Sequence, residues 1–288
     1  MLLLALAMLT ACNKIEVPEA DNAGQVSTEK TKKFIFTVKG DFCEPTFTAK
    51  RRAYMTADGQ DMTDLWVFDF MGGECVQTLH QVPTDEDWGS PVMALKYGSH
   101  HVYFVASRGD TPTVDETGNT ITWGTPRDTF WKDYEVSVVS TSNGNRAVTL
   151  DRVVTKLKVK FEDEVPTCCS EISVTPAEWY YGLNYVTGAP CEMKANQPRT
   201  VSVPESYVGT SGAVSVSIFG FSTASEWATD VQVTSKNTTG ETLGTATIKD
   251  APFKANRATE YSGCIFGSNG AVDVSLTDDW DDPVTGEW

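Results

Sequence analysis

The feature that most restricts how this chain can fold is a short-range alternation of apolar and polar residues. In the run from Val153 to Phe161 every second residue is apolar or β-branched, whereas Lys156, Lys158 and Lys160 occupy positions between them. Successive side chains of a β-strand point to opposite faces, so this run predicts a strand with one face on a core and the other in water. Helical periodicity is nearly absent from the rest of the chain.

Similar runs, rich in β-branched or aromatic residues and broken by Gly, Asp, Asn and Pro, recur along the sequence. They cover residues 34–38, 65–68, 101–105, 134–138, 214–218, 230–233 and 272–276. The sequence Ser-Asn-Gly-Asn at 142–145 divides these runs into two groups, because Asn-Gly is typical of a tight reversal of the chain. The pattern predicts an all-β chain of two antiparallel β-sandwich domains, at 34–145 and 146–288.

The first twelve residues have the form of a bacterial lipoprotein signal. An apolar run from Met1 leads into Leu9-Thr10-Ala11-Cys12, and a run of this length directs export but is too short to span a bilayer. We expect residues 1–11 to be a signal peptide and the thiol of Cys12 to carry the lipid. An ordinary cleaved signal is the alternative, and no Lys or Arg precedes the apolar run, as one normally would.

Residues 12–33 are rich in Glu, Ala, Asp, Gly, Ser and Thr and have no hydrophobic period, which indicates a flexible tether. Lys14 and Glu16 resemble the signal by which Bacteroidetes lipoproteins reach the outer face of the outer membrane. This resemblance favours a surface-exposed lipoprotein of the cell outer membrane, held there through the lipid on Cys12.

The 288 residues include 39 acidic and 23 basic side chains, for a formal net charge of −16. Such a surface repels nucleic acid, so we expect no nucleic-acid partner. The chain is also 40% hydrophobic and 10% aromatic, which excludes a disordered protein and makes the charge a solvated surface.

No sequence motif predicts catalysis. The three histidines, His80, His100 and His101, lie outside any H-E-x-x-H pattern, and the sequence has no G-x-S-x-G elbow. A hairpin turn explains His100 and His101 better than a pair of metal ligands, because no third ligand is evident. We therefore predict that the chain is not an enzyme and has no catalytic residue, cofactor or metal, with an unrecognised hydrolase as the alternative.

Two further groups of residues are candidate binding sites, one for calcium and one for a sugar. The acidic cluster at 278–282 lacks the glycine spacing and the closing glutamate of an EF-hand calcium loop. Tryptophans can form a sugar-binding platform, although this large side chain more often serves a core. The six candidates are Trp66, Trp88, Trp123, Trp131, Trp179 and Trp227.

Six cysteines remain besides Cys12, an even number in a protein expected in an oxidising compartment. They are Cys43, Cys75, Cys168, Cys169, Cys191 and Cys264. A bond between the adjacent Cys168 and Cys169 would be strained, so each is expected to reach elsewhere, for example to Cys191 or Cys264. We therefore predict at least one disulfide within residues 168–264. Free thiols are the alternative, and metal chelation is disfavoured because no C-x-x-C pair exists.

Four segments, in their order along the chain, resemble the Bacteroidales fimbrillin superfamily. They are the lipobox ending at Cys12, the segment MTDLWVFD at 62–69 followed by a glycine pair, the run 146–161, and the segment 261–280 that begins YSGCIF. The resemblance implies two transthyretin-like β-sandwiches and a cell-adhesion role in a fimbrium. It also implies partners: other fimbrial subunits bound by strand addition, and host or bacterial surface glycans or proteins.

The resemblance also bears on the position in a fimbria. Shaft subunits of this superfamily mature by cleavage after a basic residue, and Arg51 and Arg52 follow the predicted strand 34–38 in the right order for such a cut. A solvated basic turn is the alternative. A donor strand needs an alternating apolar run, whereas residues 281–288 include a proline and three acids.

We therefore expect a lipid-anchored structural or adhesive protein, as an accessory or anchor subunit of a fimbria. A shaft or tip pilin activated near Arg51 and Arg52 is one alternative. A carbohydrate-binding surface lipoprotein of a glycan uptake system is the other.

Overall fold

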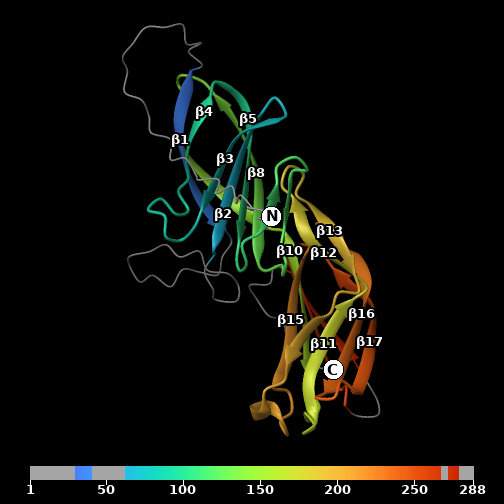
Figure 1. The fold of residues 1–288 in the computed structure, drawn as a ribbon. Coiled ribbons are helices and arrows are strands. Elements are labelled where there is room, and N and C mark those ends of the chain that lie inside the picture. The colour runs from blue at the N-terminus through green and yellow to red at the C-terminus, as the bar shows by residue number, and fades with distance from the viewer. Residues whose placement is uncertain (1–29, 41–61, 267–271, 279–288) are drawn as a thin grey trace, which may run out of the picture.

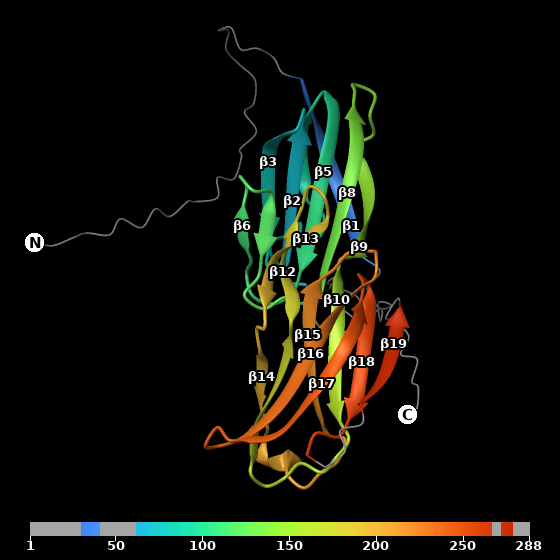
Figure 2. The same cartoon turned by 90° about the vertical axis from the view of Figure 1, so that its right-hand side faces the viewer.

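The computed structural model describes residues 30–40, 62–266 and 272–278, the last as backbone only. These residues form β-strands joined by turns, with one short 3₁₀ helix, Glu205–Tyr207, and no α-helix among them. The all-β prediction is confirmed. Within the described ranges no helix has the length and apolarity to cross a membrane. Figures 1 and 2 show two β-rich units placed end to end in an elongated molecule.

The first unit is built on a seven-stranded sheet of order β3-β2-β5-β8-β9-β1-β4. Its strands are β1 (Thr31–Gly40), β2 (Asp64–Met71), β3 (Glu74–Gln81), β4 (Val92–Lys96), β5 (Gly98–Ser107), β8 (Thr129–Val138) and β9 (Asn145–Arg152). Two register pairs alone join β8 to β9. The sheet can therefore fold over into two layers, β3-β2-β5-β8 and β9-β1-β4, as in a sandwich.

Alternation along the strands fills the space between these layers. Phe34, Phe36 and Val38 of β1 are buried, and the ring of Phe36 meets that of Phe104 edge-on at 5.2 Å. Residues from β2, β4, β5, β8 and β9 complete this core. The strand predicted at 34–38 is thus a central element of the first unit, with β4 on one side and β9, in parallel, on the other.

The second unit has two four-stranded sheets, β15-β10-β18-β19 and β14-β11-β16-β17. Its strands are β10 (Val154–Phe161), β11 (Cys169–Pro176), β14 (Arg199–Ser202), β15 (Val214–Phe221), β16 (Trp227–Asn237), β17 (Thr242–Phe253), β18 (Arg257–Gly263) and β19 (Val272–Asp278). Along β10 the residues Leu157, Val159 and Phe161 are buried and the lysines between them are partly exposed. The partition predicted from the alternation is confirmed.

A third, small sheet takes strands from both halves of the chain. Its order is β13-β12-β7-β6, where β6 (Thr113–Asp115) and β7 (Thr120–Thr122) precede the predicted domain boundary and β12 (Glu178–Asn184) and β13 (Ala189–Ala195) follow it. Figure 2 shows this sheet beside the junction of the two units. The division at residue 145 stays a prediction: β9, which starts there, pairs with β1 and β8, and the chain enters the second pair of sheets at β10.

A continuous apolar core fills the junction. The ring of Phe68, on β2, stacks on that of Tyr185, which follows β12, at 3.9 Å and 5°. Trp123, which follows β7, lies 4.8 Å from Phe221 of β15. The buried members of this junction core are Phe68, Phe70, Tyr103, Val105, Ile121, Trp123, Val153, Val154, Leu183, Tyr185, Phe219 and Phe221. A buried apolar interface of this kind holds the two units in one orientation.

A buried ion pair lies where the chain passes from one unit to the next. Arg152, the last residue of β9, donates to both carboxylate oxygens of Asp128, at 2.8 and 3.2 Å. The same guanidinium donates to Asn256 of the second unit at 2.9 Å and lies 4.7 Å from the centre of the Phe130 ring. Removing either charge would leave the other buried and uncompensated. The pair therefore holds the chain in place where it passes from the first unit to the second.

The junction core can be tested by Phe221→Ala. The side chain is fully buried and contacts residues from both halves of the chain. We expect the free energy of unfolding to fall by about 3–5 kcal/mol, the usual range for deleting a buried ring. Urea denaturation followed by tryptophan fluorescence measures the change. Val76→Ala, at a 43% exposed position, should leave the midpoint nearly unchanged; an equally small shift for Phe221→Ala would show that the junction contributes little.

Candidate functional site

Several residues singled out in the sequence lie outside the residues that the structure describes. They are the predicted lipidation site Cys12, the predicted cleavage site Arg51 and Arg52, the cysteine Cys43 and the acids at 279–282. Their roles stay predictions.

The five described cysteines, Cys75, Cys168, Cys169, Cys191 and Cys264, carry free thiols. The disulfide expected within residues 168–264 is thus not formed in this structure. Geometry explains part of the difference. Cys191 lies on β13, opposite Gly182 of β12, in the small sheet at the junction. Cys169 begins β11 and Cys168 precedes it, at the end of the second unit away from the junction, so Cys191 does not reach them.

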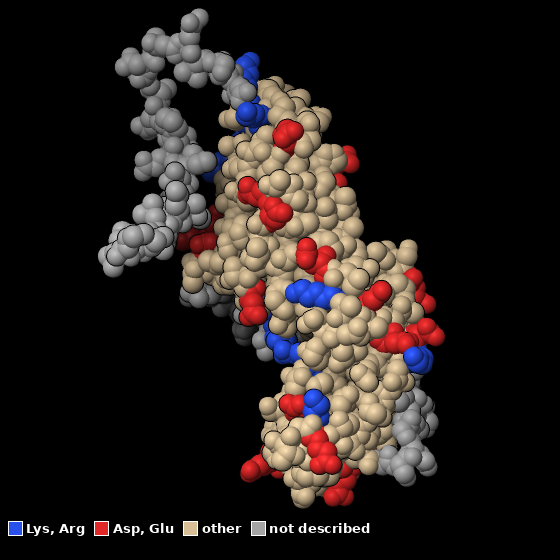
Figure 3. All heavy atoms as spheres, turned by 45° about the vertical axis from the view of Figure 1, so that its right-hand side comes forward, with Lys and Arg blue, Asp and Glu red and all other residues tan. Residues whose placement is uncertain are grey.

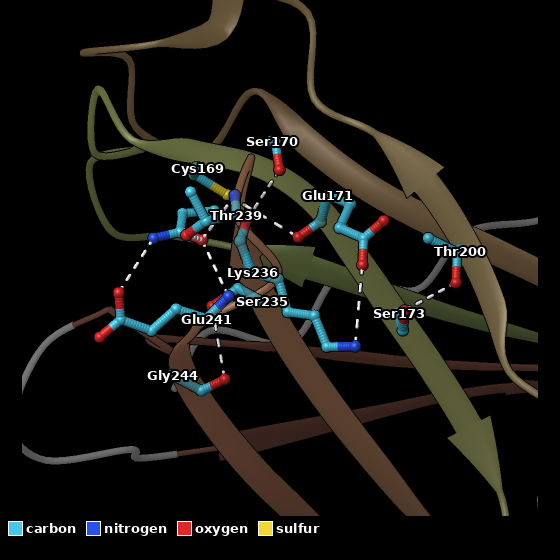
Figure 4. Close-up of polar contacts among 11 residues, drawn as sticks. Cys169, Ser170, Glu171, Ser173, Thr200, Ser235, Lys236, Thr239, Glu241 and Gly244 are labelled. Carbon is cyan, nitrogen blue, oxygen red and sulfur yellow. Dashed lines mark hydrogen bonds and ion pairs between the residues drawn. The ribbon is translucent and has the colours of Figure 1, made fainter.

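Polar contacts hold the far end of the second unit together around Cys169 (Figure 4). Ser170 Oγ donates to the backbone oxygen of Lys236 at 3.2 Å, and the Lys236 ammonium lies 3.9 Å from Glu171. These contacts fasten the β16–β17 hairpin to β11. The thiol of Cys169 is buried, and this burial, together with the neighbouring Cys168, raises its pKa. The environment is that of a structural cysteine, not a reactive one.

The histidines are accounted for by carboxylate partners. His100 is buried, with Nδ1 2.7 Å from Asp69 and Nε2 2.8 Å from the backbone oxygen of Lys96. His101 is half exposed, and its Nδ1 lies 3.0 Å from Asp133 on the neighbouring strand β8. Both residues lie within β5, so the expected hairpin turn does not explain them.

Glu135 joins His101 and Asp133, and the three side chains bring potential metal-ligand atoms within 4.8 Å of one another. Sequence reasoning missed the grouping because its members come from two strands that pair across the sheet. The hydrogen bond to Asp133 accounts for His101, and we assign no ion to the cluster.

Two of the six candidate tryptophans, Trp123 and Trp179, are buried at 2% exposure, and the other four are partly exposed. Trp131 donates from Nε1 to the backbone oxygen of Tyr185 at 2.7 Å. No tryptophan platform is therefore displayed by these three residues. Trp179 has a second role, because its edge contributes to a surface hollow.

This hollow lies beside the junction and has a volume of about 180 Å³. The first unit contributes the loop 124–127. The second contributes the last residue of β11, β12, β13, residues 197–198, the first residue of β14 and the middle of β15. Trp123, just before that loop, donates its backbone N–H to the oxygen of Tyr181 at 2.9 Å. This bond holds the loop over β12, so the hollow exists only because the two units are joined.

The floor of the hollow depends on a glycine. Trp179 donates from Nε1 to the backbone oxygen of Phe219 at 2.8 Å, which brings the indole onto the β15 backbone. A Cβ on Gly220 would lie 2.5 Å from that same Nε1 and 2.9 Å from Cζ2 of the ring. Glycine is therefore required for the indole to pack here.

The charged side chains that line the hollow are cations. Arg127, Lys194 and Arg199 line it, and no Asp or Glu among the described residues does. The Lys194 ammonium lies 4.4 Å from the centre of the Tyr181 ring, a cation–π contact. Burial raises the pKa of the Tyr181 phenol, and the nearby Arg199 guanidinium offsets part of this shift. Such a lining can hold an anion.

Nothing in the sequence marked this group. Lys194 and Arg199 are five positions apart, but Arg127 lies 67 positions before Lys194 and comes from the other unit. Figure 3 shows acidic side chains spread over both units, with basic ones interspersed.

Comparisons with known proteins give a fold. No protein-family model and no curated protein matches the sequence. A candidate adhesin from Bacteroides ovatus is 12% identical, covers 87% of this chain and 94% of its own, and has a TM-score of 0.52. A candidate adhesin from Bacteroides thetaiotaomicron is 10% identical, over 88% of this chain and 98% of its own, with a TM-score of 0.51.

The tip fimbrial protein Mfa3 from Porphyromonas gingivalis, with a C-terminal truncation, is 15% identical over 86% of this chain and 100% of its own, with a TM-score of 0.46. The likeness to the two Bacteroides proteins agrees with the resemblance to the fimbrillin superfamily. At such identities it shows the fold alone.

The floor of the hollow predicts the effect of Gly220→Ala. The added methyl group would overlap the Trp179 indole, and we expect a loss of about 1–3 kcal/mol in the free energy of unfolding. Gly124→Ala is the matched control, because a Cβ there meets nothing within 4 Å. Urea denaturation of both variants measures the difference, and equal stability of the two would contradict the close approach.

The surroundings of Cys191 predict that its alkylation depends on pH. Burial, and then the charge of Glu192, raise the pKa of Cys191 to about 11. The thiolate is the reactive form, so only about one Cys191 thiol in a thousand is ionised at pH 8. Below the pKa, the rate of alkylation should rise about tenfold for each unit of pH.

Mass spectrometry of the peptide that contains Cys191, after timed alkylation without reductant, measures this rate. The exposed Cys168 provides the internal comparison. Labelling of Cys191 that appears only after reduction would instead reveal a disulfide.

Proposed function

We propose that this chain is a lipid-anchored cell-surface adhesive protein that serves as an accessory or anchor subunit of a fimbria. Its fold, shared with candidate adhesins of Bacteroides, supports the adhesive part of this proposal. The fimbrial part comes from the sequence resemblance, and the lipid from the lipobox that ends at Cys12.

The pairing of β19 is the observation that carries the accessory or anchor role. Every residue from Val272 to Asp278 is in register with a residue of β18, from Gly263 back to Arg257. The alternating run 272–276 would otherwise be the natural donor strand for a neighbouring subunit. Because it completes a sheet of its own chain, it is not available for donation in this structure.

Strand addition remains possible at the sheet edges. β3 and β4 border the first unit's sheet, and β14, β15, β17 and β19 border the sheets of the second unit. An edge strand presents unpaired backbone N–H and C=O groups that can accept a strand from another chain. Other fimbrial subunits are accordingly the partners that we propose for these edges.

The joined units suit a protein that holds an adhesive structure on a cell. The junction core and the Arg152–Asp128 pair connect the units through buried contacts, so the molecule acts as one rigid rod. A rod of this kind keeps its two units in one orientation, while the tether predicted at residues 12–33 connects it to the lipid.

Carbohydrate binding is the second candidate function, and the hollow beside the junction favours it. The hollow offers cations and aromatic surface in a space that fits a small ligand. This candidate does not compete with the first, because an anchored adhesive protein can also bind a glycan.

The lipid anchor is tested by Cys12→Ala. We expect this change to abolish fatty-acid labelling and to release the protein from the membrane fraction, because two or three acyl chains hold a lipoprotein far more firmly than one. Metabolic labelling with a tagged fatty acid, followed by membrane fractionation, measures both effects. Cys43→Ala, which also changes a cysteine in the N-terminal part of the chain, should keep the label. Persistent labelling of Cys12→Ala would refute the anchor.

N-terminal sequencing of wild-type protein from assembled surface material completes the test. A blocked, lipidated Cys12 supports the anchor role. A start at Arg52 or Ala53 in self-polymerised filaments would favour a shaft pilin instead.

A further inference from the structure

The hollow beside the junction differs in charge from the rest of the molecule. Arg127, Lys194 and Arg199 line it, and no acidic side chain of the described part of the chain does, although the chain has 39 acidic and 23 basic residues. A random patch of this surface would contain more carboxylates than cations. The excess positive charge is therefore local, and it faces into the hollow.

These three cations have no carboxylate partner among the described residues, whereas several lysines elsewhere do. Lys132, Lys158 and Lys160 each have a carboxylate oxygen at 2.8 to 3.0 Å. Such pairing is the usual state of a cation on an acidic surface. Three unpaired cations around one hollow leave positive charge that an anionic ligand can neutralise.

The cations are held in place from different directions. The stem of Arg127 lies against Gly109, where an added Cβ would be 2.8 Å from its Cγ. Lys194 rests on the Tyr181 ring and is opposite Trp179 in the β12–β13 ladder. Arg199 begins β14, directly after the turn that contains Pro198. A site whose charged groups are positioned in advance loses less entropy when it binds.

The shape and the walls of the hollow indicate the class of ligand. A volume of about 180 Å³ equals the space of about six water molecules, which suits a single sugar ring more than a large cofactor. Pro126, Pro176, Pro198 and Ile218 provide apolar wall surface for the C–H face of such a ring. A peptide bound by strand addition needs backbone N–H donors, and proline has none.

We propose that this hollow binds an acidic sugar: a saccharide residue whose carboxylate is held by Arg127, Lys194 and Arg199. The planar fork of an arginine donates two parallel hydrogen bonds to a carboxylate, so Arg127 and Arg199 supply the geometric selectivity. Lys194, which is exposed, adds a third positive charge at the rim. The proposal does not depend on the fimbrial role, since it rests on the hollow alone.

The test uses the purified full chain and isothermal titration calorimetry. The probe is an oligogalacturonate, and its methyl ester of the same length is the matched ligand, because it keeps the sugar and removes the charge. We expect the acid to bind at least about tenfold more tightly than the ester, as for the loss of one charge-assisted contact. Equal affinity for the two, or no binding of the acid, would overturn the proposal.

Variants assign the binding to the hollow. Arg127→Gln, Arg199→Gln and Lys194→Gln should each weaken binding of the acid about tenfold or more. Lys132→Gln, an exposed lysine paired with Asp151 away from the hollow, should leave it unchanged. Far-ultraviolet circular dichroism checks that each variant is folded. Lys194 is exposed, so the affinity of Lys194→Gln is the one least affected by a change in protein stability.

Two further ligands distinguish the sources of an anion. Hexaglutamate that binds as tightly as the oligogalacturonate would overturn the sugar in favour of an acidic peptide. Acetate or sulfate alone that competes fully at equal concentration would show that the sugar ring contributes nothing, and would also overturn the proposal. Weak or absent competition by both supports recognition of the charged ring.

Discussion

The junction core is the interaction on which the rest of the structure depends. Each unit has its own sandwich core, but Phe68, Trp123 and Phe221 belong to a third cluster that neither unit can bury alone. A ring exposed at the end of a sandwich would remain in water, and burying a large apolar side chain contributes about 1.5–3 kcal/mol. The units therefore gain stability by staying together, and the small sheet β13-β12-β7-β6 adds backbone hydrogen bonds across the same boundary.

The hollow is a consequence of that junction. Its loop from the first unit is tied to β12 by the bond between Trp123 and Tyr181, and its floor requires the indole of Trp179 to lie on Gly220. A hinge at the junction would open or close the space and separate Arg127 from Lys194 and Arg199. A rigid junction instead keeps the three cations in one arrangement, which is what a site with selectivity needs.

The sequence predicted the local part of this fold and missed the distant part. Period-two alternation identified the strands because side-chain direction in a strand depends on neighbouring residues alone, as the buried and exposed faces of β10 confirm. It could not show that β7 would pair with β12, since that pairing joins residues about sixty positions apart and depends on the junction. The hollow was invisible for the same reason. The expected disulfide is not formed, because counting cysteines carries no information about their positions. Cys191, one of the two suggested partners, lies in the small sheet at the junction, away from Cys168, and the other, Cys264, is also a free thiol.

The acidic surface and the cationic hollow act on an anionic glycan over different distances. The net charge of −16 repels a polyanionic glycan, but ions screen exposed charges beyond about 8 Å at physiological salt. Inside the hollow, low-dielectric walls such as Pro126 and Ile218 reduce this screening, so the three cations act with greater strength at contact than the surface does at a distance. A surface of this kind rejects weak, unspecific attachment of polyanions, because only a group that enters the hollow meets an excess of positive charge. The negative charge on the surface and the positive charge in the hollow thus favour recognition of a single acidic sugar over adsorption of a whole polyanionic glycan.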